Sequence, residues 1–599
     1  MHESINQNPF RNVLKGAFFS RVIERVLGLD RLADIYAKRP FGGSPLDFLK
    51  HVLESLNVTL EVSDQRETIK KIPAKGSLLV VANHPLGGLE GVAIASFLLR
   101  HRPDTKVLTN ALLTKIPELQ SIFIGVDILS SQRSRGNTAG IREARAHLAS
   151  GGVLLLFPAG KVATFNFSQR KVSDYPWNRF AGRLVRKTGA TVLPLYVDAY
   201  NSRMFYMLAL MHRFLRTAML PRELANKGSQ TLRVVTGELI SAKEFQYMET
   251  DERVTACLRL ATELLQLKQR GKIIHSPKAF AQLPLSTVDA LPSSGSDLLQ
   301  QLMTMEDCQV VCNEAYAVYI APFDRLGVVM DAIGQAREYT FREAGEGTGN
   351  SSDVDQFDPY YLHVFVWDKH RLRIVGGYRL GRVHEIVARC GIDGLYARTL
   401  YSLDLEYLKK LGNPLELGRS FVHPDYQRKP AALDLLWRGI GRYVASHPEF
   451  DTLFGAVSIS NEHSDMARAL ISECMLESFQ AEQKFLNNVE PVAPLSVSDK
   501  VWSREMLATL SHVPLVNKLI GCCDPGKALP ILLRHYLSLN GKFVCFSVNK
   551  AFNDSLDGLI LVDLSKVPEK YMKRYLGAEG LEHYQKHWKI QVQAGNDCA

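Results

Sequence analysis

Short apolar segments alternate with helical segments between residues 70 and 240, and this alternation constrains the fold more than any other feature of the chain. The expected strands are β-branched or apolar runs at Ser77–Ala82, Lys106–Thr109, Val153–Phe157, Thr191–Val197 and Leu232–Thr236. The expected helices between them lie at Leu89–Leu99, Thr138–Ala149 and Asn178–Lys187. Strands that alternate with helices predict an α/β layer fold with a largely parallel sheet.

Length and composition indicate more than one domain. With 599 residues, the chain exceeds the size at which a single hydrophobic core continues to grow. Pro, Ser and Gly are frequent between residues 276 and 297, which is typical of a linker. Beyond it, expected strands cover Tyr361–Trp367, Arg371–Arg379, Leu415–Val422 and Thr452–Ser458, with an expected helix at Ala431–Val444. We therefore predict two α/β domains, residues 1–275 and 298–599, joined by a linker at 276–297.

The charge balance restricts the kinds of partner. Lys and Arg total 72 and Asp and Glu total 62, which gives a net charge of +10. A basic chain suits a membrane surface, a nucleic acid or an acidic carrier protein. The sequence has no signature of a nucleic-acid-binding domain and its basic residues are scattered, so we expect no nucleic-acid partner.

Membrane-spanning and metal-binding patterns are also missing from the sequence. No uninterrupted apolar run reaches the length of a transmembrane helix, and the first residues lack a signal-peptide pattern. The nine Cys include no C-x-x-C pair, which favours a reducing cytoplasm over a disulfide framework. Cys308 and Cys312 have no His or Cys cluster nearby, so we expect no metal site.

Residues 8–28 have the pattern of an amphipathic helix. Apolar residues recur at steps of three and four, at Phe10, Val13, Leu14, Phe18, Val22 and Val26. Basic residues lie largely on another side, at Arg11, Lys15, Arg21 and Arg25. Such a helix can lie in a lipid interface or pack on its own domain, and the pattern leaves both interpretations open.

An Asn-His-Pro-Leu-Gly-Gly-Leu-Glu motif follows the first expected strand, at residues 83–90. Side chains at the carboxyl end of a strand face the crevice where α/β proteins bind ligands. Histidine side chains in general titrate near neutrality, so a histidine at position 84 can take a proton from a hydroxyl. Glu90 can orient the imidazole and stabilise the imidazolium. Gly87 and Gly88 allow the backbone to bring the two side chains together. The motif predicts a general base and its orienting carboxylate, with a hydrogen-bonded structural histidine as the alternative.

A second block, Phe-Pro-Ala-Gly-Lys at residues 157–161, follows another apolar strand, and its Gly turn and Lys can hold an anionic acceptor. A later strand contains Val192-Leu193-Pro194. This ordered set resembles the lysophospholipid acyltransferase family over roughly residues 70–240. The family pairs H-x4-D with F-P-E-G and V-x-P; here Glu90 follows after five residues, and Ala159 replaces the Glu of F-P-E-G. These departures resemble the branch that includes lyso-ornithine-lipid O-acyltransferases.

That resemblance implies acyl transfer from a thioester to a hydroxyl. It implies catalytic roles for His84 and Glu90. The implied substrate-binding residues are Asn83, Gly87, Gly88, Phe157, Pro158, Gly160 and Lys161. Six further residues lie in surroundings similar to that branch, and each also has a structural interpretation such as a helix cap or a core position: Asn137, Arg142, Asp174, Trp177, Asn201 and Ser202.

The strand at residues 415–422 and the basic segment after it form a second candidate site. Strand alternation predicts that Glu416 and Ser420 share one face and that Arg419 points to the other. The segment Gln-Arg-Lys-Pro-Ala-Ala at residues 427–432 then opens a helix, whose N-terminus attracts phosphate.

This stretch resembles the GNAT acyltransferase fold, whose phosphate loop reads Q/R-x-x-G-x-G/A. Gln427 and Ala432 match its ends, but Pro430 replaces the central Gly and lacks a backbone N–H. A phosphopantetheine arm needs fewer amides than coenzyme A, so the loop favours acyl carrier protein as the donor. Acyl carrier proteins are acidic, and we expect Arg428 and Lys429 to contact one.

Residues 310–580 resemble acyl-homoserine-lactone synthases and, more closely, ornithine N-acyltransferases, through Arg337-Glu338, Asp355 to Asp358, and Glu416 to Arg419. The resemblance implies that Asp355, Asp358 and Glu416 hold a cationic amino acid, aided by Arg337 and Arg419. One of these carboxylates, with Glu416 as the expected catalytic residue, or an ordered water would accept the proton of the amine. A solvated turn at the Asp cluster and a structural ion pair between Glu416 and Arg419 are the alternatives.

Together the two resemblances imply a bifunctional enzyme of ornithine lipid synthesis. The C-terminal domain would attach a 3-hydroxyacyl group from acyl carrier protein to ornithine, and the N-terminal domain would acylate the hydroxyl of the lyso-ornithine lipid. Neither step requires a metal or redox cofactor. We expect a cytoplasmic protein, peripheral on the inner face of the membrane. The alternatives are a lysophosphatidic-acid-type acyltransferase with a degenerate GNAT-like domain and a non-enzymatic membrane-binding protein.

Overall fold

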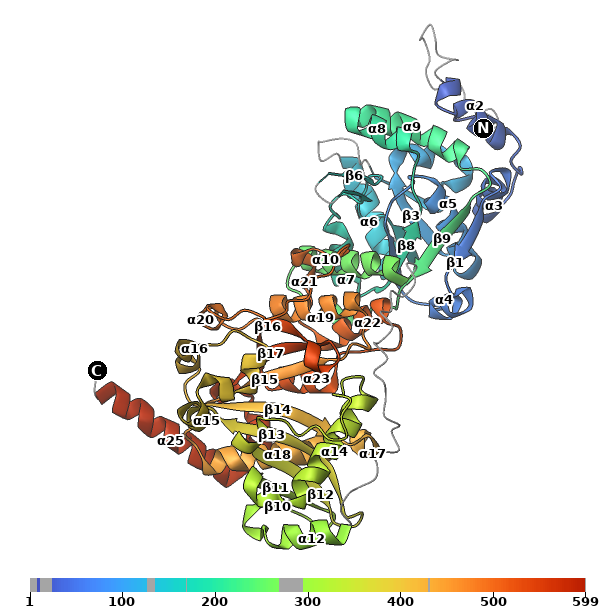
Figure 1. The fold of residues 1–599 in the computed structure, drawn as a ribbon. Coiled ribbons are helices and arrows are strands. Elements are labelled where there is room, and N and C mark those ends of the chain that lie inside the picture. Colours follow the sequence, from blue (N-terminus) through green and yellow to red (C-terminus); the bar gives the residue numbers. More distant parts are fainter. Residues whose placement is uncertain are drawn as a thin grey trace. The chain divides into compact units, whose positions relative to one another are not determined.

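The computed structural model describes residues 8–10, 24–126, 135–167, 170–268, 295–428 and 431–597. These residues form two compact units (Figure 1). Unit 1 contains the described residues of Met1–Lys272 and Val501–Pro525, and unit 2 those of Ile273–Lys500 and Gly526–Ala599. Most of the helix expected at 8–28, and the part of the expected linker up to residue 294, lie outside the described residues. Residues 295–297, also expected in the linker, instead begin α12 (Gly295–Met303).

A largely parallel sheet forms the centre of unit 1, as predicted. In the described residues its strand order is β1-β9-β8-β2-β5-β3-β4, and only the β8–β9 pair is antiparallel. The strands are β1 (Thr59–Val62), β2 (Leu78–Ala82), β3 (Thr105–Asn110), β4 (Phe123–Val126), β5 (Val153–Leu156), β8 (Thr191–Asp198) and β9 (Thr231–Thr236). All residues of β2 are buried, because helices cover both faces of the sheet, and this explains its continuous apolar sequence.

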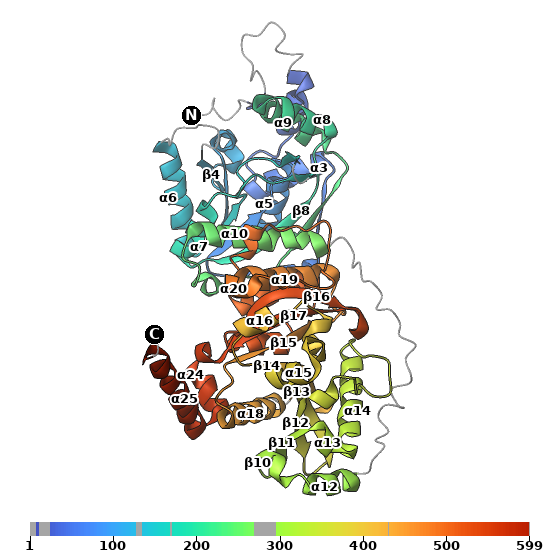
Figure 2. The same cartoon turned by 60° about the vertical axis from the view of Figure 1, so that its left-hand side comes forward.

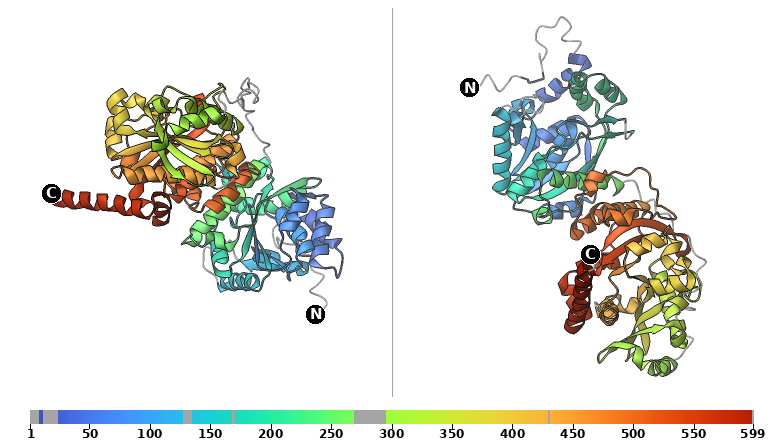
Figure 3. Two further views of the ribbon diagram at one scale, coloured as in Figure 1. Left: turned by 90° about the horizontal axis from the view of Figure 1, so that it is seen from below. Right: turned by 90° about the vertical axis from the view of Figure 1, so that its left-hand side faces the viewer.

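The helices of unit 1 lie on both sides of this sheet (Figures 2 and 3). They are α2 (Leu29–Ala37), α3 (Pro45–Ser55), α4 (Gln65–Lys71), α5 (Leu89–His101), α6 (Arg135–Ala149), α7 (Phe180–Thr188), α8 (Arg203–Met211), α9 (Arg213–Asn226) and α10 (Asp251–Glu263). Alternate β2 residues, Leu78, Val80 and Ala82, pack in one core with side chains of α3 and α5. The other face carries α6, α7 and α10. All three helices expected in this region are confirmed within a few residues.

A segment from far downstream completes unit 1. The helices α21 (Arg504–Leu507) and α22 (Val513–Cys523) pack against α10 and the short helix that follows it. Lys518 donates hydrogen bonds to the Leu239 carbonyl at 2.9 Å and to Glu244 at 2.7 Å. Leu515 is completely buried. Unit 1 is therefore discontinuous in sequence, which no local pattern indicates.

Unit 2 is built on a mixed sheet, which agrees with the predicted mixed α/β domain. Its strand order in the described residues is β10-β11-β12-β13-β14-β15-β17-β16, and β14–β15 is the parallel pair. The strands are β10 (Gln309–Cys312), β11 (Tyr316–Pro322), β12 (Leu362–Asp368), β13 (Arg373–Arg382), β14 (Pro414–Val422), β15 (Thr452–Ile459), β16 (Lys542–Asn549) and β17 (Ser555–Asp563). The main helices are α14 (Val328–Glu343), α18 (Ala431–Ser446), α19 (Asp465–Ser478), α24 (Glu569–Leu576) and α25 (Ala578–Asp597).

A β-bulge in β14 changes which side chains share a face. Gly377 pairs with Phe421 and Arg379 with Gly418, so two β14 residues stand opposite one residue of β13. Arg419, in the bulge, has a φ of +47°. The expectation from strict alternation is therefore wrong. Arg419 lies on the side of Arg379, whereas Ser420 lies on the other side of the sheet, where it influences the pKa of Tyr378.

The parallel pair β14–β15 is short. Residues Pro414–Leu417 of β14 pair with residues Thr452–Gly455 of β15. Within the described residues, the remaining parts of these two strands do not pair with each other. The two strands therefore diverge toward their carboxyl ends, next to the bulge.

Among the described residues, no helix has both the length and the apolar character that a membrane crossing needs.

The role of the downstream segment can be tested with Leu515→Ala. We expect unit 1 to lose about 2–5 kcal/mol of stability, because removal of a fully buried Leu side chain leaves a cavity. Hydrogen–deuterium exchange of the full chain should show faster exchange in β2. Ile531→Ala, an exposed position in α23 (Ile531–Ser538), is the control. Unchanged β2 exchange in Leu515→Ala would show that residues 501–525 do not stabilise unit 1.

Candidate active sites

The His84–Glu90 pair lies directly after β2, where the sequence predicts it. Nδ1 of His84 lies 2.9 Å from Oε1 of Glu90. The same oxygen accepts hydrogen bonds from the N–H groups of Leu86 at 3.0 Å and Gly87 at 2.8 Å. The Glu90 side chain is completely buried, and the His84 side chain is 14% exposed. Because Nδ1 faces the carboxylate, Nε2 is the imidazole nitrogen that remains to accept a proton.

Electrostatic interactions favour the ionised form of Glu90. Burial alone would raise the pKa of this carboxyl, but the hydrogen bond and charge of His84, with the Gly87 N–H, hold it below its ordinary value. Burial instead raises the pKa of Asp174, although its carboxylate accepts hydrogen bonds from the His84 backbone and the Trp177 indole, each at 3.0 Å. An ionised Glu90 stabilises the imidazolium that forms when the histidine takes up a proton.

The turn that brings the pair together depends on Gly87. Its φ is +105°, a region that L-residues rarely adopt. A Cβ at Gly87 would lie 2.8 Å from Leu220 and 2.9 Å from Val162. At Gly88, φ is −127°, and the nearest atom to a Cβ would be on Leu224 at 3.7 Å. The backbone and the packing therefore require a glycine at the first position and not at the second.

Two asparagines fix the backbone of the motif. The Asn83 side chain donates to the Val197 carbonyl at 3.0 Å and accepts from the Val197 N–H at 2.6 Å. Asn201 donates to the carbonyls of Pro85 at 3.1 Å and Leu86 at 3.3 Å. Asn83, predicted to contact substrate, thus makes its contacts in this structure with β8.

The Phe-Pro-Ala-Gly-Lys block packs beside the imidazole. The ring centroids of Phe157 and His84 are 4.7 Å apart. Gly160 has a φ of +63°, and its N–H donates to the Phe157 carbonyl at 3.0 Å, which closes the turn. Pro158 is buried, whereas Lys161 is exposed. The block therefore places the Phe157 ring against His84. It also carries an exposed ammonium four residues later, on Lys161.

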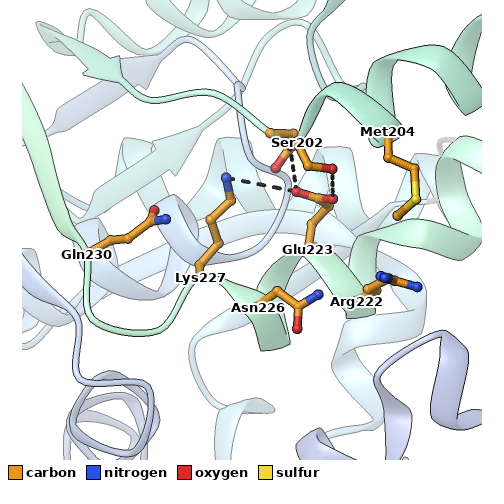
Figure 4. A pocket seen from close by; sticks show the side chains of 8 residues that line it. Ser202, Met204, Arg222, Glu223, Asn226, Lys227 and Gln230 are labelled. Carbon is orange, nitrogen blue, oxygen red and sulfur yellow. Dashed lines mark hydrogen bonds and ion pairs between the residues drawn. The ribbon is translucent and has the colours of Figure 1, made fainter.

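A cavity of about 320 Å³ lies at the start of α8 and the end of α9 (Figure 4). Glu223 accepts hydrogen bonds there from the Ser202 N–H at 2.9 Å and hydroxyl at 2.5 Å. The Lys227 ammonium lies 3.9 Å from Glu223, and burial lowers the pKa of this lysine. Asn201, which bonds the His84 motif, also lines the cavity. The lining residues are Asn201, Ser202, Met204, Arg222, Glu223, Asn226, Lys227 and Gln230.

In unit 2, Arg337 of α14 anchors a buried network of arginines and aspartates. Its guanidinium makes two hydrogen bonds of 2.9 Å with the Asp358 carboxylate and lies 3.1 Å from Asp353. These side chains are almost completely buried. Burial alone would raise the pKa of Asp358, but Arg337 and Arg379 hold it far below its ordinary value.

The same network reaches the protein surface at Asp355. Its carboxylate lies 2.6 Å from Arg379 and 3.0 Å from Arg419, and its side chain is 21% exposed. Arg419 also lies 3.2 Å from Asp353. The interpretation of the Asp cluster as a solvated turn is wrong, because both predicted aspartates pair with arginines and Asp358 is buried.

Glu416 lies beside this network without an arginine partner of its own. Its carboxylate accepts a hydrogen bond from the Tyr361 hydroxyl and another from the Ala397 N–H at 2.7 Å. Burial raises its pKa. The predicted alternative of an ion pair between Glu416 and Arg419 is wrong, because the Arg419 guanidinium pairs with Asp353 and Asp355.

Several predicted features have no described contact that tests them. Arg428 is exposed after α17 (Pro424–Gln427). Lys429 and Pro430 lie outside the described residues, as does the side chain of Asn137. Contact of the basic segment with acyl carrier protein therefore stays a prediction. Within the part of the chain that the structure describes, no group of three or more His, Cys, Asp and Glu could hold a metal ion.

The structure adds a pair of buried carboxylates that the sequence did not indicate. Glu346 follows α14 and accepts a hydrogen bond from Ser458 at 3.0 Å. Ser458 belongs to the part of β15 beyond its pairing with β14, and its β17 neighbour in the sheet is Asp557. Burial and the charge of Asp557 raise the pKa of Glu346 to about 8. A Glu in the glycine-rich segment 345–352 carries no signal that distinguishes it from a loop residue.

Two family models match different parts of the chain. Residues 17–268 match the family model described as Acyltransferase, and residues 336–438 match the one described as Acetyltransferase (GNAT) domain. The glycine N(alpha)-acyltransferase of Bacteroides thetaiotaomicron is 29% identical over 43% of this chain and 80% of its own. The lyso-glycine lipid O-acyltransferase of Phocaeicola vulgatus is 28% identical over 32% of this chain and 65% of its own.

The fold and these matches define an acyltransferase with an acyltransferase domain and a GNAT domain, which confirms the predicted class. The L-ornithine N(alpha)-acyltransferase of Rhodobacter capsulatus is 30% identical over 38% of this chain and 80% of its own length. The chain belongs to the family of this N-acyltransferase, and it joins that domain to the second acyltransferase domain on one polypeptide.

The two glycines of the motif provide a matched pair of variants. We expect Gly87→Ala to destabilise unit 1 by about 1–3 kcal/mol, because the new Cβ has a positive φ and meets Leu220 and Val162. Gly88→Ala should cost less than about 1 kcal/mol, as at an ordinary helix N-cap. Thermal unfolding of the two full-length variants measures the difference. Equal losses would contradict the role assigned to Gly87.

Glu346 predicts a pH dependence of stability. Its pKa of about 8 in the folded chain lies above the ordinary 4.5, so its contribution is fully present below about 4.5 and is lost as the pH rises through about 8. Glu346→Gln removes this loss. We expect its melting temperature, relative to the wild type, to increase from about pH 5 to about pH 9. Glu343→Gln, at an exposed position, is the control, and a pH-independent difference for Glu346→Gln would refute the assignment.

Proposed function

We propose that this chain is a bifunctional ornithine lipid synthase that carries out two consecutive acylations. The observation that carries the proposal is the presence, in one polypeptide, of two different acyltransferase domains, each with a candidate site. One site is the His84–Glu90 pair of unit 1, and the other is the Arg419 bulge beside the diverging strands of unit 2. The names of the relatives, which describe N-acylation of amino acids and O-acylation of a lyso-lipid, support the same division.

Unit 2 performs the first acylation. The amine of the amino acid attacks the thioester carbonyl of a 3-hydroxyacyl group on acyl carrier protein; a C–N bond forms and the C–S bond breaks. Where β14 and β15 diverge, backbone groups of both strands are left without partners across the gap and can bond an extended thioester arm. Arg428, with the neighbouring basic residues of the sequence, provides the surface for the acidic carrier protein.

The amino acid binds at the accessible end of the arginine–aspartate network. Asp355 and Arg419 are the members with exposed surface, and they present one negative and one positive group. A zwitterionic amino acid offers the complementary ammonium and carboxylate. The amine proton passes to a carboxylate, Glu416 as predicted or one of the Glu346–Asp557 pair. Burial raises the pKa of each of these carboxyls, which makes its ionised form a stronger base.

Unit 1 performs the second acylation. Nε2 of His84 takes the proton of the 3-hydroxyl of the lyso-ornithine lipid while its oxygen attacks a second acyl thioester. Glu90 stabilises the resulting imidazolium. As the C–S bond breaks, the imidazolium returns the proton to the leaving thiolate. Both steps proceed without a metal or redox cofactor, and the amphiphilic intermediate places the enzyme on the inner face of the cytoplasmic membrane.

Glycine is the second candidate for the amino acid. Two of the relatives are named glycine N(alpha)-acyltransferases. In addition, Asp355 and Asp358, two of the three carboxylates expected to hold the cationic amino acid, already pair with arginines of this chain. An amino acid without a side-chain cation requires no additional carboxylate.

The proposal predicts different lipids from variants of the two sites. In a host that lacks aminolipids, the wild type should produce a diacylated, ninhydrin-positive lipid. His84→Ala should accumulate the monoacylated lipid, because it lacks the base for the second step, and Arg419→Ala should produce neither. Lipid mass spectrometry measures the products, and the head-group mass distinguishes ornithine from glycine.

The control is the folding of each variant, measured by hydrogen–deuterium exchange in β2 and β13. Diacylated lipid from His84→Ala would disprove the assigned base. Product from lysophosphatidate, with no aminolipid, would replace the proposal with a glycerolipid acyltransferase.

A further inference from the structure

The helix pair α8–α9 exposes an unusual concentration of large apolar side chains. Met207 is 64% exposed, Met211 74% and Phe214 67%. The full set, which we call the α8–α9 apolar patch, is Met204, Met207, Leu210, Met211, Phe214 and Leu215. Isolated exposed apolar residues are ordinary, but six within one hairpin indicate a surface that is covered in function.

The charged residues within the hairpin, up to Glu223, have one sign. Between Asp198 and Glu223 the sequence contains four Arg and no Asp or Glu. The side chain of Arg203 is exposed at the start of α8. A helical surface with apolar Met, Leu and Phe side chains and only basic charges is complementary to a bilayer that contains anionic lipid.

The apolar patch extends onto a neighbouring hairpin of unit 1. α8 packs beside β6 (Thr164–Asn166), which pairs with β7 (Lys171–Ser173). Phe167, which follows β6, is 69% exposed, and Arg170 before β7 is exposed as well. Figure 1 shows α8, α9 and β6 on the same side of unit 1. The added residues repeat the combination of an apolar ring and a cation.

The buried side of the hairpin contacts the His84 motif directly. A Cβ at Gly87 would lie closest to the Leu220 side chain of α9, and a Cβ at Gly88 closest to that of Leu224. Asn201, two residues before α8, donates hydrogen bonds to the carbonyls of Pro85 and Leu86. One helix pair thus contacts the motif through its buried side chains while it presents apolar side chains to the outside.

We propose that the α8–α9 apolar patch inserts into the interface of an anionic bilayer, so that the lipid acceptor reaches His84 from the membrane. This inference rests on the proposed function for the nature of the acceptor, and it assigns membrane contact to a described surface distinct from residues 8–28. A bilayer explains the patch better than a protein partner does, because the exposed side chains are apolar and the polar groups among them are basic.

Methionine oxidation provides a test without substitutions. The full-length protein is treated with hydrogen peroxide, alone and with vesicles of phosphatidylcholine and phosphatidylglycerol, and the peptides are analysed by mass spectrometry. Oxidation of Met207 and Met211 should slow at least about fivefold on vesicles, because oxidation follows exposure. Met303, which is 64% exposed in unit 2, is the control and should be unaffected. Equal oxidation of Met207 and Met211 with and without vesicles would overturn the proposal.

A variant with Met207→Ser, Met211→Ser and Phe214→Ser tests the energetic contribution. We expect at least about tenfold weaker partitioning onto the same vesicles, because three buried apolar side chains are lost. A variant with Phe41→Ser and Leu112→Ser, also exposed apolar positions of unit 1, is the control. Unchanged partitioning of the triple variant, or protection of the methionines by acyl carrier protein and not by vesicles, would overturn the proposal.

These measurements need no turnover, so they separate the inference from the proposed function. Protection of Met207 and Met211 by vesicles in a protein that makes no aminolipid would support the membrane surface and refute the ornithine lipid synthase. Aminolipid synthesis by a protein whose Met207 and Met211 are not protected by vesicles would support the proposed function and refute the membrane surface.

Discussion

A buried carboxylate must have partners that replace water, and this constraint shapes both candidate sites. Glu90 is completely buried in unit 1 and is held by His84 and two backbone N–H groups. Asp358 is completely buried in unit 2 and is held by Arg337 and Arg379. In each case the buried carboxylate pairs with a histidine or an arginine, and this pairing holds the partner side chain in one orientation.

Under the proposed function, the two sites use this constraint for different chemistry. In unit 1 the partner is an imidazole, which can gain and lose a proton, so the buried charge serves proton transfer. In unit 2 the partners are guanidinium groups, which stay charged, so the network serves as a rigid electrostatic frame. Only Asp355 and Arg419 of this frame reach the surface. In the proposed mechanism the amine proton therefore moves to another group, and the Glu346–Asp557 pair lies at the part of β15 that no longer pairs with β14.

The features that could be predicted from the sequence are those determined by local residue patterns. The parallel strands, the helix that begins at Leu89 and the proximity of His84 to Glu90 depend on residues that are close in the chain, and all agree with the structure. The bulge at Arg419 was not predictable, because it depends on how β13 pairs with β14, and it reversed the expected face of that side chain. Contacts of residues 501–525 with unit 1, and of Glu346 with β15, join distant parts of the sequence and leave no local signal.

The packing of α9 on Gly87 connects the site of unit 1 to its exterior. A positive φ and contacts with Leu220 and Val162 leave no room for a side chain at Gly87, so the motif that carries His84 and the hairpin that carries the apolar patch are in direct contact. A lipid acceptor is poorly soluble in water, and its extraction into solution would cost about 0.8 kcal/mol for each CH₂ group of its chain. A site whose supporting helices themselves enter the lipid interface avoids most of this cost, because the chain stays in an apolar environment while the hydroxyl moves to the base.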